Sequence, residues 1–348
     1  MTESNKNSRP VILFDLYPRS VKQIFDVETF ARLQSLGEIV RLEDESKAAP
    51  DDFIDRYLPT ATILIGHSSL PKQRLDRAPL LKVVFNVEGN FMPNVDYVEC
   101  HRRGIHVLTT APVFAKPVAE MALCMAISCA RRVHEADAAI RKGNETLYGE
   151  GDNYDSILLS GRTIGLVGCG NVGRALLPLI RPLAKEILVY DPWIHSNVLA
   201  DMNVTPVSLE DCFTRSTAIF LLSAVTIENQ SSIGASYFRS MSRGSIVILV
   251  SRAGLVNFDE LLDAAADGHI RAAIDVWPQE PIAADHRARN TPNTLLQAHR
   301  AGNIPEIWPL MGRLVVDDSE LILKNLPPQR CQKAQWETVS KIRSKPVG

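Results

Sequence analysis

Three polar residues in the second half of the chain each lie close behind an apolar run. Arg252 follows SIVILV (245–250), Glu280 lies in DVWPQEP, and His299 ends LLQAH. Histidine titrates nearest neutral pH and can exchange a proton with a substrate oxygen, and a neighbouring carboxylate orients the ring and favours its protonated form. Arginine offers a planar fork of donors to a carboxylate or a polarised carbonyl. Together these residue types predict proton transfer at a carbonyl oxygen of an anionic molecule.

The apolar runs before these residues are typical of buried strands. In an open parallel sheet the carboxyl ends of the strands line the ligand crevice, so the three residues are expected on one edge of a sheet. Each taken alone is more readily explained as a surface arginine, a loop glutamate or a capping histidine. Their occurrence at successive strand ends, behind the glycine-rich turn described next, favours a catalytic site.

A glycine-rich turn lies within TIGLVGCGNVGRALLPLI, residues 163–180. Gly168 permits a tight turn, Gly170 lets a phosphate approach the backbone, and Gly173 lets helix and strand pack closely. A helix that begins at Asn171 and Val172 directs backbone N–H groups at a pyrophosphate. The turn therefore predicts a dinucleotide site, with a purely structural strand-turn-helix as the alternative.

An acidic residue follows the next strand, EILVYD, at the distance expected of a ribose ligand. Asp191 lies eighteen residues after Gly173, and Pro192 and Trp193 follow it without an arginine or lysine to bind a 2′-phosphate. This pattern predicts NAD as the cofactor in preference to NADP.

Short β-rich runs alternate with helical patterns along most of the chain, which predicts an α/β protein with parallel sheets. The runs before residue 113 predict one small α/β unit, and a later series predicts a six-stranded, doubly wound Rossmann-type domain. Between them, residues 118–143 predict one long helix that ends at Gly143. The strand runs comprise residues 11–16, 62–66, 81–87, 105–110, 163–168, 186–191, 218–222, 245–250, 272–277 and 293–298.

Composition limits the class of protein. The 348 residues favour two domains, and 45% apolar residues with a net charge of −2 indicate neither a nucleic-acid nor a membrane partner. The longest apolar window, 121–130, is shorter than a membrane span, and the polar start MTESNKNSRP is expected to be disordered, with no signal peptide. Six scattered cysteines, without CxxC pairs, predict buried thiols in a reducing cytoplasm and no metal site.

The ordered motifs SGRTIGLVGCGNVGR, VYDP, MSRGSIVILVSRAGLV, AAIDVWPQEP and the late AH resemble the D-2-hydroxyacid dehydrogenases, the group of phosphoglycerate, glyoxylate/hydroxypyruvate and D-lactate enzymes. The resemblance implies hydride transfer between a nicotinamide and C2 of a 2-hydroxy or 2-oxo acid. It implies Arg252 as substrate anchor, Glu280 and His299 as the acid/base pair, and Ser251 and Asp275 in the cofactor site.

The resemblance also implies a discontinuous organisation. A flavodoxin-like substrate domain is expected over residues 1–113 with 306–348, and an NAD-binding domain over 114–305. The long helix is expected to cross between the domains and to support a homodimer. Two other functions remain open: an NAD(H)-sensing regulator resembling corepressors, and a formate- or phosphite-type dehydrogenase.

The chain departs from the family where a loop is expected to bind the substrate carboxylate. Glu88, Gly89 and Asn90 occupy this place, and an acidic side chain there repels a simple 2-oxo acid unless it meets a partner. Glu88 either points away or contacts a polar or cationic group of an unusual substrate. Arg300 similarly either adds positive potential for a second acidic group or is a surface residue paired with Glu306.

Overall fold

The computed structural model describes residues 9–146, 155–339 and 341. Residues 1–8, which form most of the polar N-terminal segment MTESNKNSRP, lie outside the described residues. The chain forms two compact units. The first unit combines Met1–Phe114 with Ile304–Gly348, and the second unit is Ala115–Asn303.

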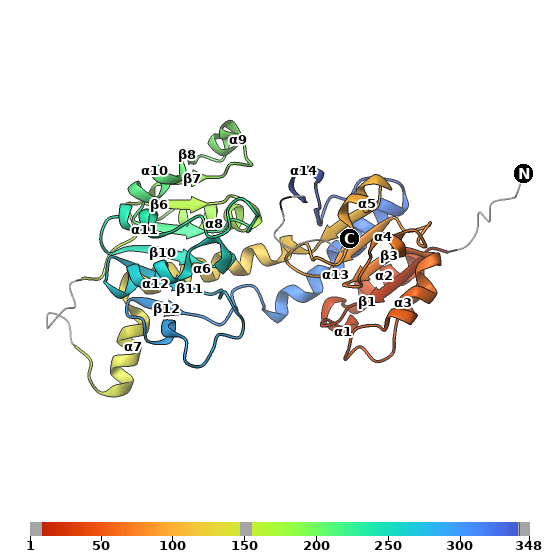
Figure 1. Ribbon diagram of the computed structural model, residues 1–348, viewed down its shortest axis with the longest axis horizontal. Helices are drawn as coiled ribbons and strands as arrows, with labels where there is room; N and C mark the ends of the chain where they lie inside the picture. Colours follow the sequence, from red (N-terminus) through yellow and green to blue (C-terminus); the bar gives the residue numbers. More distant parts are fainter. Residues whose placement is uncertain (1–8, 147–154, 340, 342–348) are drawn as a thin grey trace, which may run out of the picture. The chain divides into compact units, whose positions relative to one another are not determined.

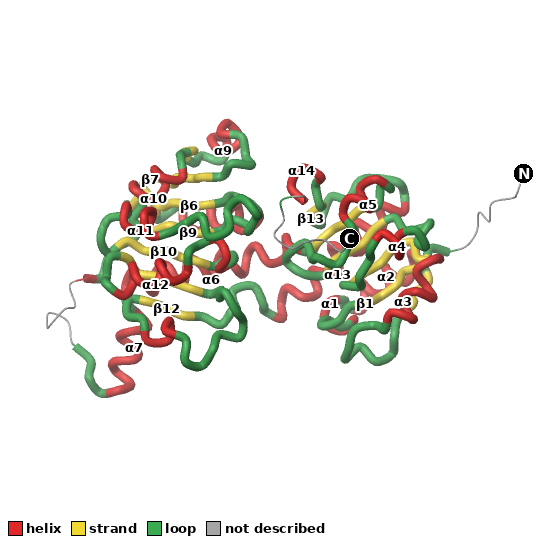
Figure 2. Tube along the Cα trace, in the orientation of Figure 1, coloured by secondary structure: helices red, strands yellow, loops and turns green. Residues whose placement is uncertain are grey.

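The second unit is built on a seven-stranded sheet of order β12-β11-β10-β9-β6-β7-β8 in which every pair is parallel (Figure 2). The order reverses between β6 and β9, which is the topological switch point of a Rossmann-type sheet. All six expected strands are present, and β8 is a further short edge strand. The strands are β6 (Arg162–Val167), β7 (Ala184–Tyr190), β8 (Thr205–Pro206), β9 (Ala218–Leu221), β10 (Ser245–Leu249), β11 (Ile270–Ile274) and β12 (Thr294–Leu296).

Helices cover both faces of this sheet, so the central strand β10 is buried along its whole length (Figure 1). Along β10, Val247 and Leu249 contribute to one buried cluster, whereas Ile246 and Ile248 contribute to the other. The helices are α6 (Ala115–Arg131), α7 (Val133–Lys142), α8 (Asn171–Ile180), α9 (Ser196–Asp201), α10 (Leu209–Arg215), α11 (Ala235–Ser240) and α12 (Phe258–Ala266).

The first unit has a sheet of order β13-β5-β4-β3-β1-β2. Its strands are β1 (Val11–Asp15), β2 (Glu38–Val40), β3 (Ala61–Gly66), β4 (Val83–Asn86), β5 (His106–Thr109) and β13 (Gln332–Lys333). The parallel strands have the flavodoxin-like order, and only β13 is antiparallel. The predicted fold class, a Rossmann-type sheet with a flavodoxin-like second α/β unit, is confirmed.

The C-terminal segment completes the first unit, because β13 pairs with β5 and α13 packs against α1 and α2. The helices of this unit are α1 (Val21–Ile24), α2 (Val27–Leu36), α3 (Asp51–Tyr57), α4 (Lys72–Leu75), α5 (Tyr97–Arg102), α13 (Trp308–Leu323) and α14 (Trp336–Val339). The sequence patterns did not predict β2, β8 or β13, which are too short to carry an apolar period.

The prediction of one uninterrupted helix over residues 118–143 is wrong. Arg132 takes a left-handed conformation, with φ of 53°, and separates α6 from α7. The buried Arg271 donates hydrogen bonds to the carbonyl oxygens of Cys129 and Ala130, and the N–H of Ile157 donates to the second of these. These carbonyls are the acceptors that a continuing helix requires, so tertiary contacts end α6. Gly143, also left-handed, ends α7 as expected.

One helical run is longer and more apolar than the sequence count indicated. Residues 111–131 form a 21-residue helical run that contains an 18-residue window with a mean hydropathy of 1.5, so by length and composition the run could cross a membrane. Half of this window is buried inside the protein, and α6 packs against α8. The run therefore has the features of a core helix.

The cysteines are free thiols, five of them buried and Cys124 exposed. Burial raises the pKa of the Cys129 and Cys212 thiols to about 12, which keeps both protonated near neutral pH. Among the residues that the structure describes, no group of three or more His, Cys, Asp or Glu side chains could hold a metal ion.

The contacts of Arg271 predict a large effect on stability. Its side chain is 8% exposed, and it also donates to the backbone oxygen of Asp155. Arg271→Leu removes the guanidinium donors from three backbone carbonyls and should lower the free energy of unfolding by about 3 kcal/mol in urea denaturation. The exposed Arg215, paired with Glu186 at 3.0 Å, is the control, and Arg215→Leu should cost about 1 kcal/mol or less. Equal effects would contradict this account of the helix end.

Candidate active site

The turn after β6 requires glycine at two positions and is open at a third. Gly168 has φ of +97°, and a Cβ there would lie 2.8 Å from the backbone nitrogen of Ser223. A Cβ on Gly173 would lie 2.8 Å from the carbonyl oxygen of Gly168. A Cβ on Gly170 would have no protein atom within 4 Å. The turn is therefore packed on the protein side and open where a phosphate would approach.

Asp191 follows β7 and is bonded to this same turn. One carboxylate oxygen accepts the N–H of Cys169 at 2.8 Å, and the other accepts the N–H of Trp193 at 2.9 Å. Gly170 is the N-cap of α8 and makes no side-chain cap, and Asn171 and Val172 begin the helix. The carboxylate expected to bind a ribose is thus held beside the helix terminus expected to bind phosphate, with Pro192 directly after it.

A buried hydroxyl at the end of β10 also fits a bound dinucleotide. The Oγ atom of Ser251 is buried and has no hydrogen-bond partner in the structure. Buried polar atoms are rarely left unpaired, so such an atom on this edge of the sheet is consistent with a ligand group. With the open face of Gly170, it makes the second unit suited to hold the dinucleotide that the sequence predicts.

His299 lies in the loop after β12, and Asp275, after β11, fixes that loop. The N–H of His299 donates to the carbonyl oxygen of Asp275 at 2.8 Å. The fully buried carboxylate of Asp275 accepts the N–H groups of Arg300 at 2.9 Å and Ala301 at 3.3 Å. His299 has φ of 51°, and these bonds hold it in that uncommon conformation. The backbone of Arg300 is thus fixed, and the residue is exposed to solvent.

Glu280 and His299 are in direct contact. The Nδ1 atom of His299 lies 2.6 Å from Oε2 of Glu280, and the other oxygen of Glu280 accepts the N–H of Trp277 at 3.0 Å. The indole N–H of Trp277 donates to the carbonyl oxygen of Gln297 at 2.9 Å. The two side chains remain 42% and 37% exposed. Since Nδ1 binds the carboxylate, Nε2 is the ring nitrogen left for a reacting oxygen.

Arg252 lies on the same edge of the sheet, after β10. Its backbone is extended, and its Nη1 atom donates to the carbonyl oxygen of Ser251 at 2.6 Å. The structure therefore brings Glu280 and His299 into contact and places Arg252 on the edge that they share, with the end of β11 between β10 and β12.

Glu88, Gly89 and Asn90 belong to the first unit and follow β4. Both carboxylate oxygens of Glu88 accept hydrogen bonds from Arg19, at 3.0 and 3.4 Å. Sequence reasoning missed Arg19, because a single arginine after the first strand carries no signal and only the strand order β4-β3-β1 brings it to Glu88. The Glu88 side chain is therefore directed at a cation of the protein itself.

Comparison with known proteins points to one family. Residues 123–301 match the family model of the D-isomer specific 2-hydroxyacid dehydrogenase, NAD binding domain. A glyoxylate reductase of Korarchaeum cryptofilum is 30% identical over 290 residues, which are 83% of this chain and 87% of the relative. A D-3-phosphoglycerate dehydrogenase of Methanocaldococcus jannaschii is 24% identical over 84% of this chain and 55% of the relative.

Solved structures agree with this fold. A phosphoglycerate oxidoreductase from Rhizobium etli is 41% identical, with a TM-score of 0.80, over 94% of this chain and 99% of that chain. A D-mandelate dehydrogenase of Rhodotorula graminis is 17% identical, with a TM-score of 0.78, over 94% of this chain and 98% of that chain, and shares the fold.

The glycine turn predicts that binding and stability respond differently at two positions. Gly170→Ala should change the free energy of unfolding by about 1 kcal/mol or less, because the methyl group meets no protein atom, yet raise the Kd for NADH about tenfold or more by obstructing the phosphate. Gly168→Ala should destabilise the fold by about 2 kcal/mol through its positive φ and the Ser223 contact. Urea denaturation and fluorescence titration measure the two effects. Unchanged NADH binding by Gly170→Ala would contradict the phosphate site.

Proposed function

The chain belongs to the D-isomer specific 2-hydroxyacid dehydrogenase family, and from this premise we propose that it reduces a 2-oxo acid to the 2-hydroxy acid, with His299 as the acid. It is a dehydrogenase with an NAD-binding domain. The contact of 2.6 Å between His299 and Glu280 carries the proposal. It orients the ring and leaves Nε2 facing outward from the pair.

The proposed chemistry is an acid-assisted reduction of a carbonyl. A dinucleotide held at the turn after β6 would supply a hydride for C2 of the 2-oxo acid. Nε2 of His299 donates a proton to the carbonyl oxygen, so the product is the 2-hydroxy acid and the imidazole is left neutral. Glu280 stabilises the protonated ring before this transfer and holds its orientation, since its second oxygen is fixed by the N–H of Trp277.

The proposed substrate-binding groups follow strands β10 and β4. Arg252 binds the carboxylate or the polarised carbonyl oxygen through its guanidinium. The backbone N–H groups at Gly89 and Asn90 bind the substrate carboxylate. The proposal rests on the family membership and on the place of these residues directly after β10 and β4.

We further propose NAD as the preferred cofactor. Asp191 supports this, because a carboxylate held by the N–H of Cys169 accepts the hydroxyls of a ribose and repels a 2′-phosphate. Asp275 and Ser251 are proposed to contact the nicotinamide side. Titration with NADH and NADPH tests the preference, and tighter binding of NADPH would contradict it.

We propose that the chain works in the cytoplasm as a homodimer. The proposal rests on the family resemblance and on exposed apolar residues of α6 and α7, namely Ile127, Val133 and Ile140. The mass measured in solution by sedimentation tests it, and a monomer at micromolar concentration would contradict it.

An NAD(H) sensor and a formate- or phosphite-type dehydrogenase are the rival functions. The Glu280–His299 contact favours acid/base work at a hydroxyl or carbonyl group over either rival. NADH oxidation with a panel of 2-oxo acids separates them, because a sensor binds NADH without turnover and the other dehydrogenases oxidise formate or phosphite.

His299→Ala should lower kcat by about 10³-fold while leaving the Kd for NADH within about twofold, because it removes the acid and leaves the dinucleotide contacts. Stopped-flow assays with glyoxylate and fluorescence titration measure the two quantities. His269→Gln is the control, since His269 precedes β11 at the opposite edge of the sheet and bonds to the backbone of Met241. Parallel loss of binding and turnover in His299→Ala would refute the assignment.

A further inference from the structure

Arg19 and Glu88 form a charge-neutral pair at the carboxyl edge of the first unit's sheet. Arg19 follows β1 and Glu88 follows β4, and both lie at the same edge because β3 alone separates these strands. Two hydrogen bonds join them in a fork, and the side chains are only 14% and 26% exposed. The guanidinium also lies 5.8 Å from the ring centroid of Trp308, so two other segments contact it.

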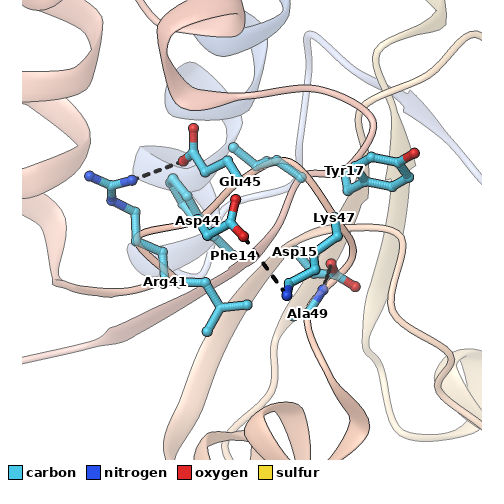
Figure 3. A pocket seen from close by; sticks show the side chains of 10 residues that line it. Phe14, Asp15, Tyr17, Arg41, Asp44, Glu45, Lys47 and Ala49 are labelled. Carbon is cyan, nitrogen blue, oxygen red and sulfur yellow. Dashed lines mark hydrogen bonds and ion pairs between the residues drawn. The ribbon is translucent and has the colours of Figure 1, made fainter.

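A pocket next to β1 supplies no excess of positive charge. Its charged lining residues are Asp15, Arg41, Asp44, Glu45 and Lys47. Arg41 lies 2.9 Å from Glu45, and Lys47 lies 3.8 Å from Asp44, so each cation that lines the pocket faces a carboxylate (Figure 3).

Asp15 adds a further acidic group to the same pocket. Its buried carboxyl group accepts the N–H of Ala49 at 2.9 Å and the hydroxyl of Ser68 at 2.6 Å. His67 follows β3, which lies between β1 and β4. Its Nδ1 atom is hydrogen-bonded to the carbonyl oxygen of Tyr17. Arg19 is the cation bonded to Glu88, directly before Gly89, and Glu88 already neutralises its charge.

We propose that Glu88 is a specificity-determining residue that restricts the enzyme to 2-oxo acids with an uncharged, hydroxyl-bearing or very short tail. The inference rests on the proposed function, in which the N–H groups beside Glu88 bind the substrate carboxylate. A hydroxyl group can donate to Glu88 and accept from Arg19. A second anionic group would meet the carboxylate of Glu88 and would have to displace it from Arg19, which opposes binding in a poorly solvated place.

The test compares two substrates that differ only by a phosphate, hydroxypyruvate and its phosphate ester. The wild-type enzyme should show a kcat/KM for hydroxypyruvate at least about tenfold above that for the ester, and Glu88→Gln should reduce this ratio about tenfold by lowering the KM for the ester. Glu320→Gln is the matched control. Glu320 pairs with Arg32 in the same unit, with a similar exposed fraction, and its removal should leave the ratio unchanged.

A double variant shows whether the effect passes through Arg19. Arg19→Gln combined with Glu88→Gln removes both charges, so the ratio should return to within about threefold of the wild-type value. Circular dichroism of each variant reports whether the protein is folded. Glu88→Asp keeps the negative charge and should therefore retain the preference for hydroxypyruvate.

The outcomes separate this inference from the proposed function. Three outcomes would overturn the inference and leave the dehydrogenase proposal standing. They are a wild-type preference for the phosphate ester, an unchanged ratio of the two kcat/KM values in Glu88→Gln, and a reduced ratio that persists in the double variant. Absence of turnover with every 2-oxo acid, despite NADH binding, would instead overturn the proposed function itself.

Discussion

The buried carboxylate of Asp275 holds the loop on which the proposed chemistry depends. A carboxylate taken out of water is costly unless its oxygens are hydrogen-bonded. Here two consecutive N–H groups, those of Arg300 and Ala301, bind it, and its own carbonyl oxygen accepts the N–H of His299. The side-chain and backbone acceptors of one residue thus bind three successive residues. This clamp keeps His299 at positive φ and aims its ring at Glu280.

The contact between His299 and Glu280 is supported from a second direction. Glu280 is anchored by the N–H of Trp277, whose indole in turn binds the carbonyl oxygen of Gln297, two residues before His299. The loops after β11 and β12 are therefore tied together both through Asp275 and through Trp277. A ring fixed by its neighbours loses little freedom when a substrate binds, which is how an enzyme prepares an acid for one oxygen atom.

The two units divide the work. The second unit carries the glycine turn and the proposed acid/base pair of Glu280 and His299. The first unit supplies the loop at Gly89, where this chain places an acidic residue and an arginine to match it. Two relatives are named for substrates without and with a phosphate, a glyoxylate reductase and a D-3-phosphoglycerate dehydrogenase.

The sequence by itself determined the fold class, the family, the glycine turn and the order of the strands along the chain. These are local signals: apolar runs, glycines that need positive φ or close packing, and polar residues at strand ends. Tertiary structure alone decided the break in the predicted helix, the partner of Glu88 and the contacts of Asp275. Each depends on residues far apart in the chain, as Arg271 is from Cys129 and Arg19 from Glu88. A hydrogen bond between distant residues leaves no periodicity in the sequence, because only the path of the folded chain brings its donor and acceptor together.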